Sequence, residues 1–94
     1  MARKKSYVQK EEIKTNLAEV MPATFHDPMF IKTFKAAVAV NLHKGAGKEW
    51  PITAAFPEGT KLVCEGNYRL VKNQIWLLVR SGSVYGYALR NEVQ

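Results

Sequence analysis

The hydrophobic period changes at Phe34, and this change constrains the fold more than any other feature of the chain. From Phe34 to Leu42, apolar side chains recur at every second position, with Ala36, Val38 and Val40 between them on the same face. Strict alternation is typical of a strand that is buried on one side. The sequence therefore predicts a strand from Phe34 to Leu42 and a β-rich fold for the C-terminal two-thirds of the chain.

Short strand segments separated by turn residues continue to the C-terminus. Further strands are expected at residues 60–64, 68–71, 75–80 and 84–89. Glycine, proline or asparagine marks the turns between them, at residues 57–59, 66–67, 72–73 and 81–83. Several short strands with regular turn signals are typical of a small barrel. The sequence therefore predicts a β-barrel domain over residues 34–94.

The N-terminal part has a helical period instead. Residues 1–5 are expected to be a solvated basic tail, and Ser6 and Gln9 have the spacing of a helix capping box. Apolar side chains then recur at helical spacing until proline ends the pattern, at Ile13, Leu17, Val20, Met21 and Pro22. These features predict an amphipathic helix over about residues 7–21.

A connector is expected from Pro22 to residue 33, where Asp27 and Pro28 are suited to capping one more helical turn. The predicted helix is too short to be stable alone in water, so its apolar stripe must cover the barrel or another subunit. Residues 6–33 are therefore a candidate dimerisation element.

Length and composition set the protein class. A chain of 94 residues fits one small domain, and a hydrophobic content of 47% is not that of a disordered chain. Cys64 is the single cysteine, so no intramolecular disulfide can form. No apolar stretch of about 18 residues is present, and Glu11 and Glu12 stand where a signal peptide needs apolar residues. We expect a cytoplasmic protein without a membrane span.

Four segments of the C-terminal two-thirds form an ordered pattern. They are VNLHKGAG at residues 40–47, PEGTKLVC at 57–64, WLLV at 76–79 and YGYA at 85–88. The pattern resembles the bacterial SH3-like (SH3b) domain family, in which the corresponding segments read LNVRSGPG, KKGTKVTV, WYKV and TGYV. The resemblance covers about residues 36–93 and implies a small SH3-like β-barrel that bends at glycines, here Gly59 and Gly86.

The resemblance also implies a ligand groove between the long first loop and the distal loop. The matching segments offer five aromatic side chains there, at Trp50, Tyr68, Trp76, Tyr85 and Tyr87. Aromatic rings supply flat contact area at low entropic cost and suit extended peptides. Core or rim packing is the alternative for two or three of these five, whereas Trp50, in a charged and glycine-rich loop, is expected to be exposed. The first hypothesis is therefore a protein- or peptide-binding module that acts as an adaptor or inhibitor, an organisation often found in phage and mobile-element proteins.

Residue types that carry catalysis do not gather into a motif. His26 and His43 lie in different segments, and Cys64 lies on the inward face of its predicted strand, which favours a core residue over a nucleophile. His26 and Asp27 alone do not make a metal site. The sequence at residues 45–48 lacks the full spacing of a phosphate loop. We expect no enzymatic activity, no metal and no cofactor.

Basic residues support a second hypothesis, which is nucleic-acid binding. The chain has 14 Lys and Arg against 8 Asp and Glu, a net charge of +6. The candidate contacts are Arg3, Lys4, Lys5, Arg69, Lys72, Arg80 and Arg90. Basic and aromatic groups together can hold single-stranded nucleic acid, although the same residues also fit an ordinary solvated face. A third hypothesis, from the best-known role of the resembling family, is recognition of cell-wall peptidoglycan.

Overall fold

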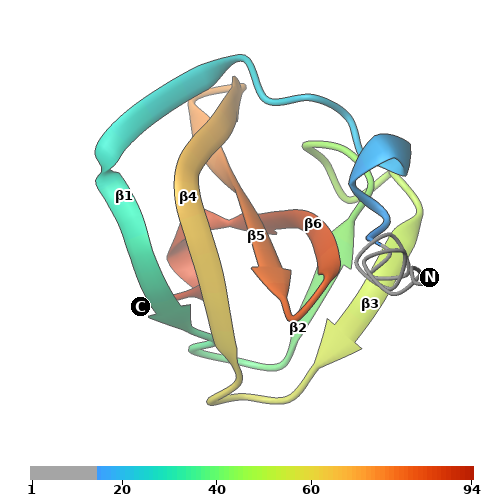
Figure 1. The fold of residues 1–94 in the computed structure, drawn as a ribbon, viewed down its shortest axis with the longest axis vertical. Helices are drawn as coiled ribbons and strands as arrows, with labels where there is room; N and C mark the ends of the chain where they lie inside the picture. The colour runs from blue at the N-terminus through green and yellow to red at the C-terminus, as the bar shows by residue number, and fades with distance from the viewer. Residues whose placement is uncertain (1–14) are drawn as a thin grey trace, which may run out of the picture.

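The computed structural model describes residues 15–94, which form a mainly β structure around one six-stranded antiparallel sheet (Figure 1). The strands are β1 (Phe25–Lys35), β2 (Val40–His43), β3 (Ile52–Phe56), β4 (Lys61–Val71), β5 (Gln74–Ser81) and β6 (Val84–Leu89), in the order β1-β4-β5-β6-β2-β3. Two 3₁₀ turns flank them, η2 (Leu17–Glu19) and η3 (Arg90–Glu92). In this described part of the chain, no helix has the length and apolarity needed to cross a membrane.

Strands β4, β5 and β6 form a meander with tight turns. Lys72 and Asn73, between β4 and β5, have φ values of 52° and 64°, as the two central residues of a type I′ hairpin turn require. Gly82, between β5 and β6, has a φ of 62° at the first central position, where type II′ turns carry glycine. The predicted strands at 75–80 and 84–89 are confirmed, while those at 60–64 and 68–71 are two halves of the single strand β4.

The predicted strand from Phe34 to Leu42 is wrong in its extent. Phe34 belongs to β1, which begins already at Phe25, and β2 starts only at Val40. Between them the chain bends, so that Val38, expected on the buried face, is 48% exposed. The bend also brings the chain end alongside, because Ala36 pairs with Val93.

The predicted connector over residues 22–33 is largely strand β1. Asp27 and Pro28 cap no helical turn; they lie where the register between β1 and β4 shifts, between His26 and Ile31. The Asp27 carboxylate instead accepts a hydrogen bond from the Met29 amide over 2.9 Å. Such irregularities bend and twist a long strand, which here allows β1 to follow the curve of β4.

The predicted N-terminal helix is not seen in the described residues. Its last third contains only the 3₁₀ turn η2, after which Val20 is already extended with a φ of −104° and a ψ of 140°. The earlier part of the predicted helix, residues 7–14, lies outside the described residues, as does the basic tail.

The buried side chains form two clusters. The inner cluster consists of Phe34, Ala36, Val40, Leu42, Leu62, Cys64, Leu77, Val79, Ala88 and Val93. The outer cluster consists of Val20, Ala46, Trp76, Leu78, Tyr87 and Leu89. The inner cluster joins side chains from β1 and β2, which are far apart in the strand order, so the sheet must curl around it.

Strand β5 contributes to both clusters. Leu77 and Val79 enter the inner cluster, whereas Trp76 and Leu78 enter the outer one. All four side chains are buried, which explains why this strand is a continuous apolar run instead of an alternating one. The outer cluster thus occupies the opposite face of the meander from the inner one.

Candidate functional site

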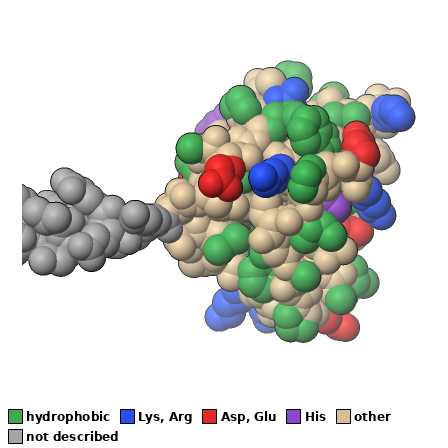
Figure 2. Space-filling view, turned by 90° about the vertical axis from the view of Figure 1, so that its right-hand side faces the viewer, with side chains coloured by type: hydrophobic (Ala, Val, Ile, Leu, Met, Phe, Trp, Pro, Cys, Tyr) green, Lys and Arg blue, Asp and Glu red, His purple; other side chains and the backbone are tan. Residues whose placement is uncertain are grey.

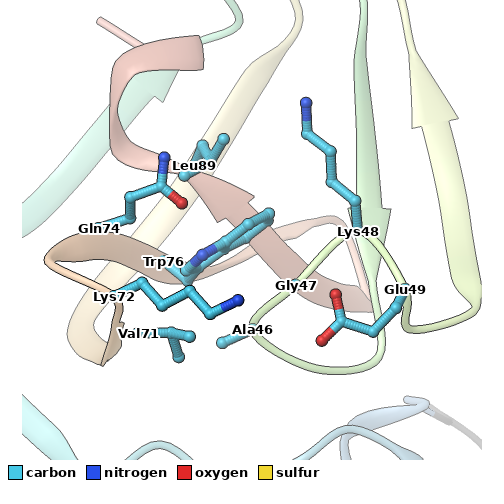
Figure 3. Close-up of a pocket in the computed structure, with 9 residues that line it drawn as sticks. All are labelled: Ala46, Gly47, Lys48, Glu49, Val71, Lys72, Gln74, Trp76 and Leu89. Carbon is cyan, nitrogen blue, oxygen red and sulfur yellow. The ribbon is translucent and has the colours of Figure 1, made fainter.

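A cleft of about 340 Å³ lies between the loop that comes after β2 and the turn between β4 and β5 (Figure 3). One wall is made by residues 46–49 of the loop, and the other by Val71, Lys72 and Gln74. Trp76 and Leu89 line its base. The volume is in the range of small-ligand and side-chain pockets. The cleft therefore lies between two segments distant in sequence, at the place where the β4–β5 turn approaches the long loop.

Hydrogen bonds within the loop fix its path. His43, a buried polar residue, donates from Nδ1 to the Trp50 carbonyl oxygen over 2.8 Å, and the Lys44 amide donates to the Pro51 carbonyl over 2.8 Å. The Trp50 ring packs against Gly45, where an added Cβ would lie 2.5 Å from the ring. Gly45 is therefore required for close approach, and the loop is held as a defined wall of the cleft.

Trp76 connects the cleft to the core. It is only 4% exposed, and its ring meets the His43 ring edge-to-face at a centroid distance of 6.1 Å. His43 in turn holds the loop through Trp50. The buried His43 therefore contacts both the base of the cleft, at Trp76, and its loop wall, at Trp50.

Opposite charges face each other across the cleft. Figure 3 shows the Lys72 and Glu49 side chains extending toward each other from the two walls, while Lys48 points away. The Lys48 ammonium lies 4.0 Å from the Glu92 carboxylate. Because Lys72 and Glu49 flank the tryptophan at the base, the cleft offers a cationic and an anionic contact on either side of an aromatic surface.

The five predicted aromatic residues do not form one groove. Trp76, Tyr85 and Tyr87 contribute to the outer cluster, and Trp50 is 39% exposed on the loop. Tyr68 pairs with Leu77 across β4 and β5, so it lies on the opposite face of the meander from Trp76. There it stacks on Phe25 at 5.3 Å. Only Trp76 of the five lines the cleft.

Tyr87 has no exposed surface, so it offers a ligand no direct contact in this conformation. Its hydroxyl donates a hydrogen bond to the Met21 carbonyl oxygen over 2.7 Å. Burial raises the pKa of Tyr87 to about 12, with the Arg69 charge opposing the rise. Its place is a structural one, beneath the N-terminal segment of the described chain.

The predicted basic residues of the described part do not converge. Arg69 donates to the Pro22 carbonyl oxygen, Arg80 pairs with Glu65 at 3.5 Å, and Arg90 lies over the Phe34 ring at 5.2 Å. Lys72 is at the cleft, and Arg3, Lys4 and Lys5 lie outside the described residues. Figure 2 shows basic side chains scattered among acidic and hydrophobic ones on one face of the molecule.

Cys64 and His26 each have local contacts in the described residues 15–94. Cys64 is buried in the inner cluster, and burial raises the pKa of its thiol, which disfavours the nucleophilic thiolate. His26 contacts the Glu65 carbonyl oxygen through Nε2 at 3.1 Å. No group of three or more His, Cys, Asp or Glu side chains is close enough to hold a metal ion in that part of the chain.

Sequence reasoning missed two features of this region. The first is the conformation of residues 16–24, which cover the outer face of the meander without forming an α-helix and bond to the Tyr85 backbone through Asn16; coverage of the barrel was one of the two alternatives expected for their apolar stripe. A single asparagine within a predicted helix carried no signal for such a contact. The second is the role of Gly45, which a pattern search identifies only as a loop glycine.

Comparisons with known proteins leave the family open. No protein-family model matches the chain, and searches of curated proteins and of solved structures gave no match.

Proposed function

We propose that this protein is a non-enzymatic binding module, built on a small SH3-like barrel, that holds a protein or peptide partner and acts as an adaptor or inhibitor. The cleft between residues 46–49 and the β4–β5 turn is the contact site. The observation that carries this proposal is the meeting of Trp76, Lys72 and Glu49 between two loops that the fold holds in place.

Two features of the sheet support the barrel. The inner cluster draws side chains from β1, β2, β4, β5 and β6, which requires a strongly curled sheet. The chain end also returns to β1, since the amides of Lys35 and Gln94 each donate to the other's carbonyl oxygen over 2.8 Å. A curled sheet with paired chain ends is the arrangement expected of a closed or nearly closed barrel.

The cleft has the composition of a recognition site. A buried aromatic at the base supplies contact area, and charges on the walls supply orientation and specificity. A peptide that carries an acidic and a basic residue on either side of an apolar one would complement Lys72, Glu49 and Trp76. The hairpin turn fixes the backbone of Lys72, so less entropy is lost when a ligand binds.

The test is a pull-down with the tagged full-length protein, performed with and without nuclease. We expect a stoichiometric protein band that survives nuclease treatment and is weakened severalfold by Lys72→Glu or Glu49→Lys. Lys61→Glu is the matched control, because Lys61 is exposed at the far end of β4. Capture that is indifferent to both cleft variants would reject the cleft as the site.

Nucleic-acid binding is the second candidate, favoured by the net charge of +6. It predicts that protein bands disappear after nuclease treatment and that affinity falls steeply with salt concentration. Affinity for single-stranded DNA that stays unchanged between low and high salt would reject this candidate.

A further inference from the structure

Residues 16–24, here called the strap, cross the face of the meander that carries the outer cluster. Asn16 is bonded to β6 at one end, and the Thr24 amide donates to the Tyr68 carbonyl of β4 over 3.3 Å at the other. Between them, Val20 is buried among the outer cluster. Figure 1 shows the chain continuing from η2 to the start of β1 along this path. The strap is thus a 3₁₀ turn followed by an extended stretch from Val20, and it lies on the sheet without being one of its strands.

Asn16 closes an open edge of β6. Its side-chain Nδ2 donates to the Tyr85 carbonyl oxygen over 3.0 Å, and its Oδ1 accepts from the Tyr85 amide over 2.6 Å. A side-chain amide offers the same donor and acceptor as a peptide group, so it replaces a neighbouring strand at this point. The Tyr85 amide needs such a partner, because β2 pairs with β6 only between His43 and Tyr87, whereas the Tyr85 carbonyl oxygen also accepts from the Thr53 hydroxyl of β3 over 3.0 Å.

The middle of the strap is held through its backbone. The Met21 amide donates to the Lys44 carbonyl oxygen, and the Met21 carbonyl accepts from the Tyr87 hydroxyl, both over 2.7 Å. The Pro22 carbonyl accepts from Arg69 over 2.6 Å. Backbone contacts of this kind are independent of sequence, so any extended peptide can make them. The strap's own side chains contact the sheet through Asn16 and Val20, with Met21 and Ala23 packed partly buried against the outer cluster.

The strap fits its surface loosely. An apolar cavity of about 470 Å³ lies against it, lined by Leu17, Ala18, Val20, Pro22, Ala23, Asn67 and Leu78. Ala23, which packs partly buried against the outer cluster, borders this cavity with a side chain too small to fill the space. Atoms that line an unfilled space lose dispersion contacts. A peptide with a larger apolar side chain at this position would contact more of the sheet than the strap does.

From these contacts we infer that the outer face of β4, β5 and β6 is a binding surface for a peptide segment of a partner protein that binds as the strap does, and that the strap occupies this surface in its absence. The partner segment carries an amide side chain in the place of Asn16, a branched apolar residue in the place of Val20, and a larger apolar residue in the place of Ala23. This surface is separate from the cleft, so the inference goes beyond the proposed function, and the strap is a competitor built into the chain.

The test uses a fluorescent peptide of residues 15–24, blocked at both ends, titrated with the full-length protein. Covalent attachment gives the strap an effective concentration in the millimolar range, so the wild-type protein should bind the peptide weakly. Asn16→Ala removes two hydrogen bonds from the strap and should tighten peptide binding by about 5- to 30-fold. Glu19→Gln is the matched control and should behave as the wild type, since Glu19 is exposed on the same strap.

Equal peptide affinity for Asn16→Ala and the wild type would overturn the inference, as would no binding to either. An Asn16→Ala variant that fails to fold would also overturn it, because a displaceable strap cannot be needed for folding.

In the wild type, the Met21 and Thr24 amides should exchange hydrogen at least tenfold faster than the β5–β6 amides. Exchange at the same rate would mean that the strap opens only on global unfolding, which would also overturn the inference. None of these measurements uses the cleft, so Lys72→Glu should leave peptide binding unchanged, and a failed pull-down would reject the proposed function separately.

Discussion

The two faces of β5 are covered in different ways. The inner face is covered by other strands of the same sheet, and its residues Leu77 and Val79 have no exposed surface. The outer face is covered by the strap and by the loop that carries Ala46, and each of these two coverings borders a cavity. One sheet therefore has one densely packed face and one face with accessible space.

The difference indicates where stability and binding reside. Close packing on the inner face leaves no room for a ligand, and a change in side-chain volume there lowers the stability of the whole fold. The outer face is closed by segments without regular pairing, which open at a lower free-energy cost than strands do. Binding surfaces are drawn from such low-stability regions, so substitutions on the two faces should differ in their effects on stability and on binding.

The largest effect should come from the inner cluster. Phe34→Ala removes a fully buried ring and should lower the free energy of unfolding by about 3–5 kcal/mol. Val20→Ala, the corresponding truncation in the strap, should cost only about 1–2 kcal/mol. Urea denaturation of the two variants measures both values. Equal losses would mean that the two faces contribute alike to stability.

The next effect is a pH dependence on the outer face. Burial raises the pKa of Tyr87 to about 12, above its ordinary value of 10.0, so folding favours the neutral phenol. The stabilisation is therefore complete below pH 10 and is lost as the pH rises through 12, at a cost of up to about 3 kcal/mol. Urea denaturation at a series of alkaline pH values measures this loss.

Tyr87→Phe is the control for this titration. It removes the hydrogen bond to Met21 and should cost about 1 kcal/mol at neutral pH, but it should also flatten the loss of stability between pH 10 and 12. A variant whose alkaline profile matches the wild type would show that Tyr87 does not carry the effect.

A smaller loss of stability is expected at Gly86 and Gly82, where glycine is favoured for two different physical reasons. A Cβ on Gly86 would lie 2.5 Å from the Leu42 Cβ, so Gly86→Ala should cost about 1–3 kcal/mol through overpacking against the inner cluster. Gly82 has open space around it but a φ of 62°, so Gly82→Asn should cost less than about 1 kcal/mol, because asparagine tolerates a positive φ. Thermal unfolding compares the two, and a loss at Gly82 as large as that at Gly86 would contradict this account.

The sequence predicted the inner face better than the outer one. The strands at 75–80 and 84–89 and the turn between them follow from local patterns, since apolar runs and turn residues act over a few positions. Gly86 lies within β6, where an added Cβ would meet Leu42 and Thr53, so glycine is needed there for a close approach between strands. The alternation from Phe34 to Leu42 failed at Val38 because a bend between two strands can keep the same apolar pattern as a single strand.

The outer face depends on contacts between distant segments, which local patterns do not encode. Trp76 lines the cleft whereas Tyr68 does not. Tyr68 pairs with Leu77, the neighbour of Trp76, and neighbouring residues of a strand point to opposite faces of the sheet. The helical spacing through Leu17 and Val20 predicted a helix, yet Val20 is buried from an extended segment. A short apolar stripe can be buried in either conformation, and here the hydrogen bonds of Asn16, Met21 and Thr24 to distant parts of the chain favour the extended one.

The smallest expected effect tests the loose fit of the strap directly. Ala23→Leu adds apolar volume beside the 470 Å³ cavity and should raise the free energy of unfolding by about 0.5–1 kcal/mol, because it fills space that already exists. The same variant should weaken binding of the strap peptide, since its own strap competes better. Ala55→Leu, on exposed β3 away from the cavity, should change stability by less than about 0.5 kcal/mol and leave peptide binding unchanged. If Ala23→Leu were destabilising, the outer face would be packed as tightly as the inner one, and the contrast between the two faces would be lost.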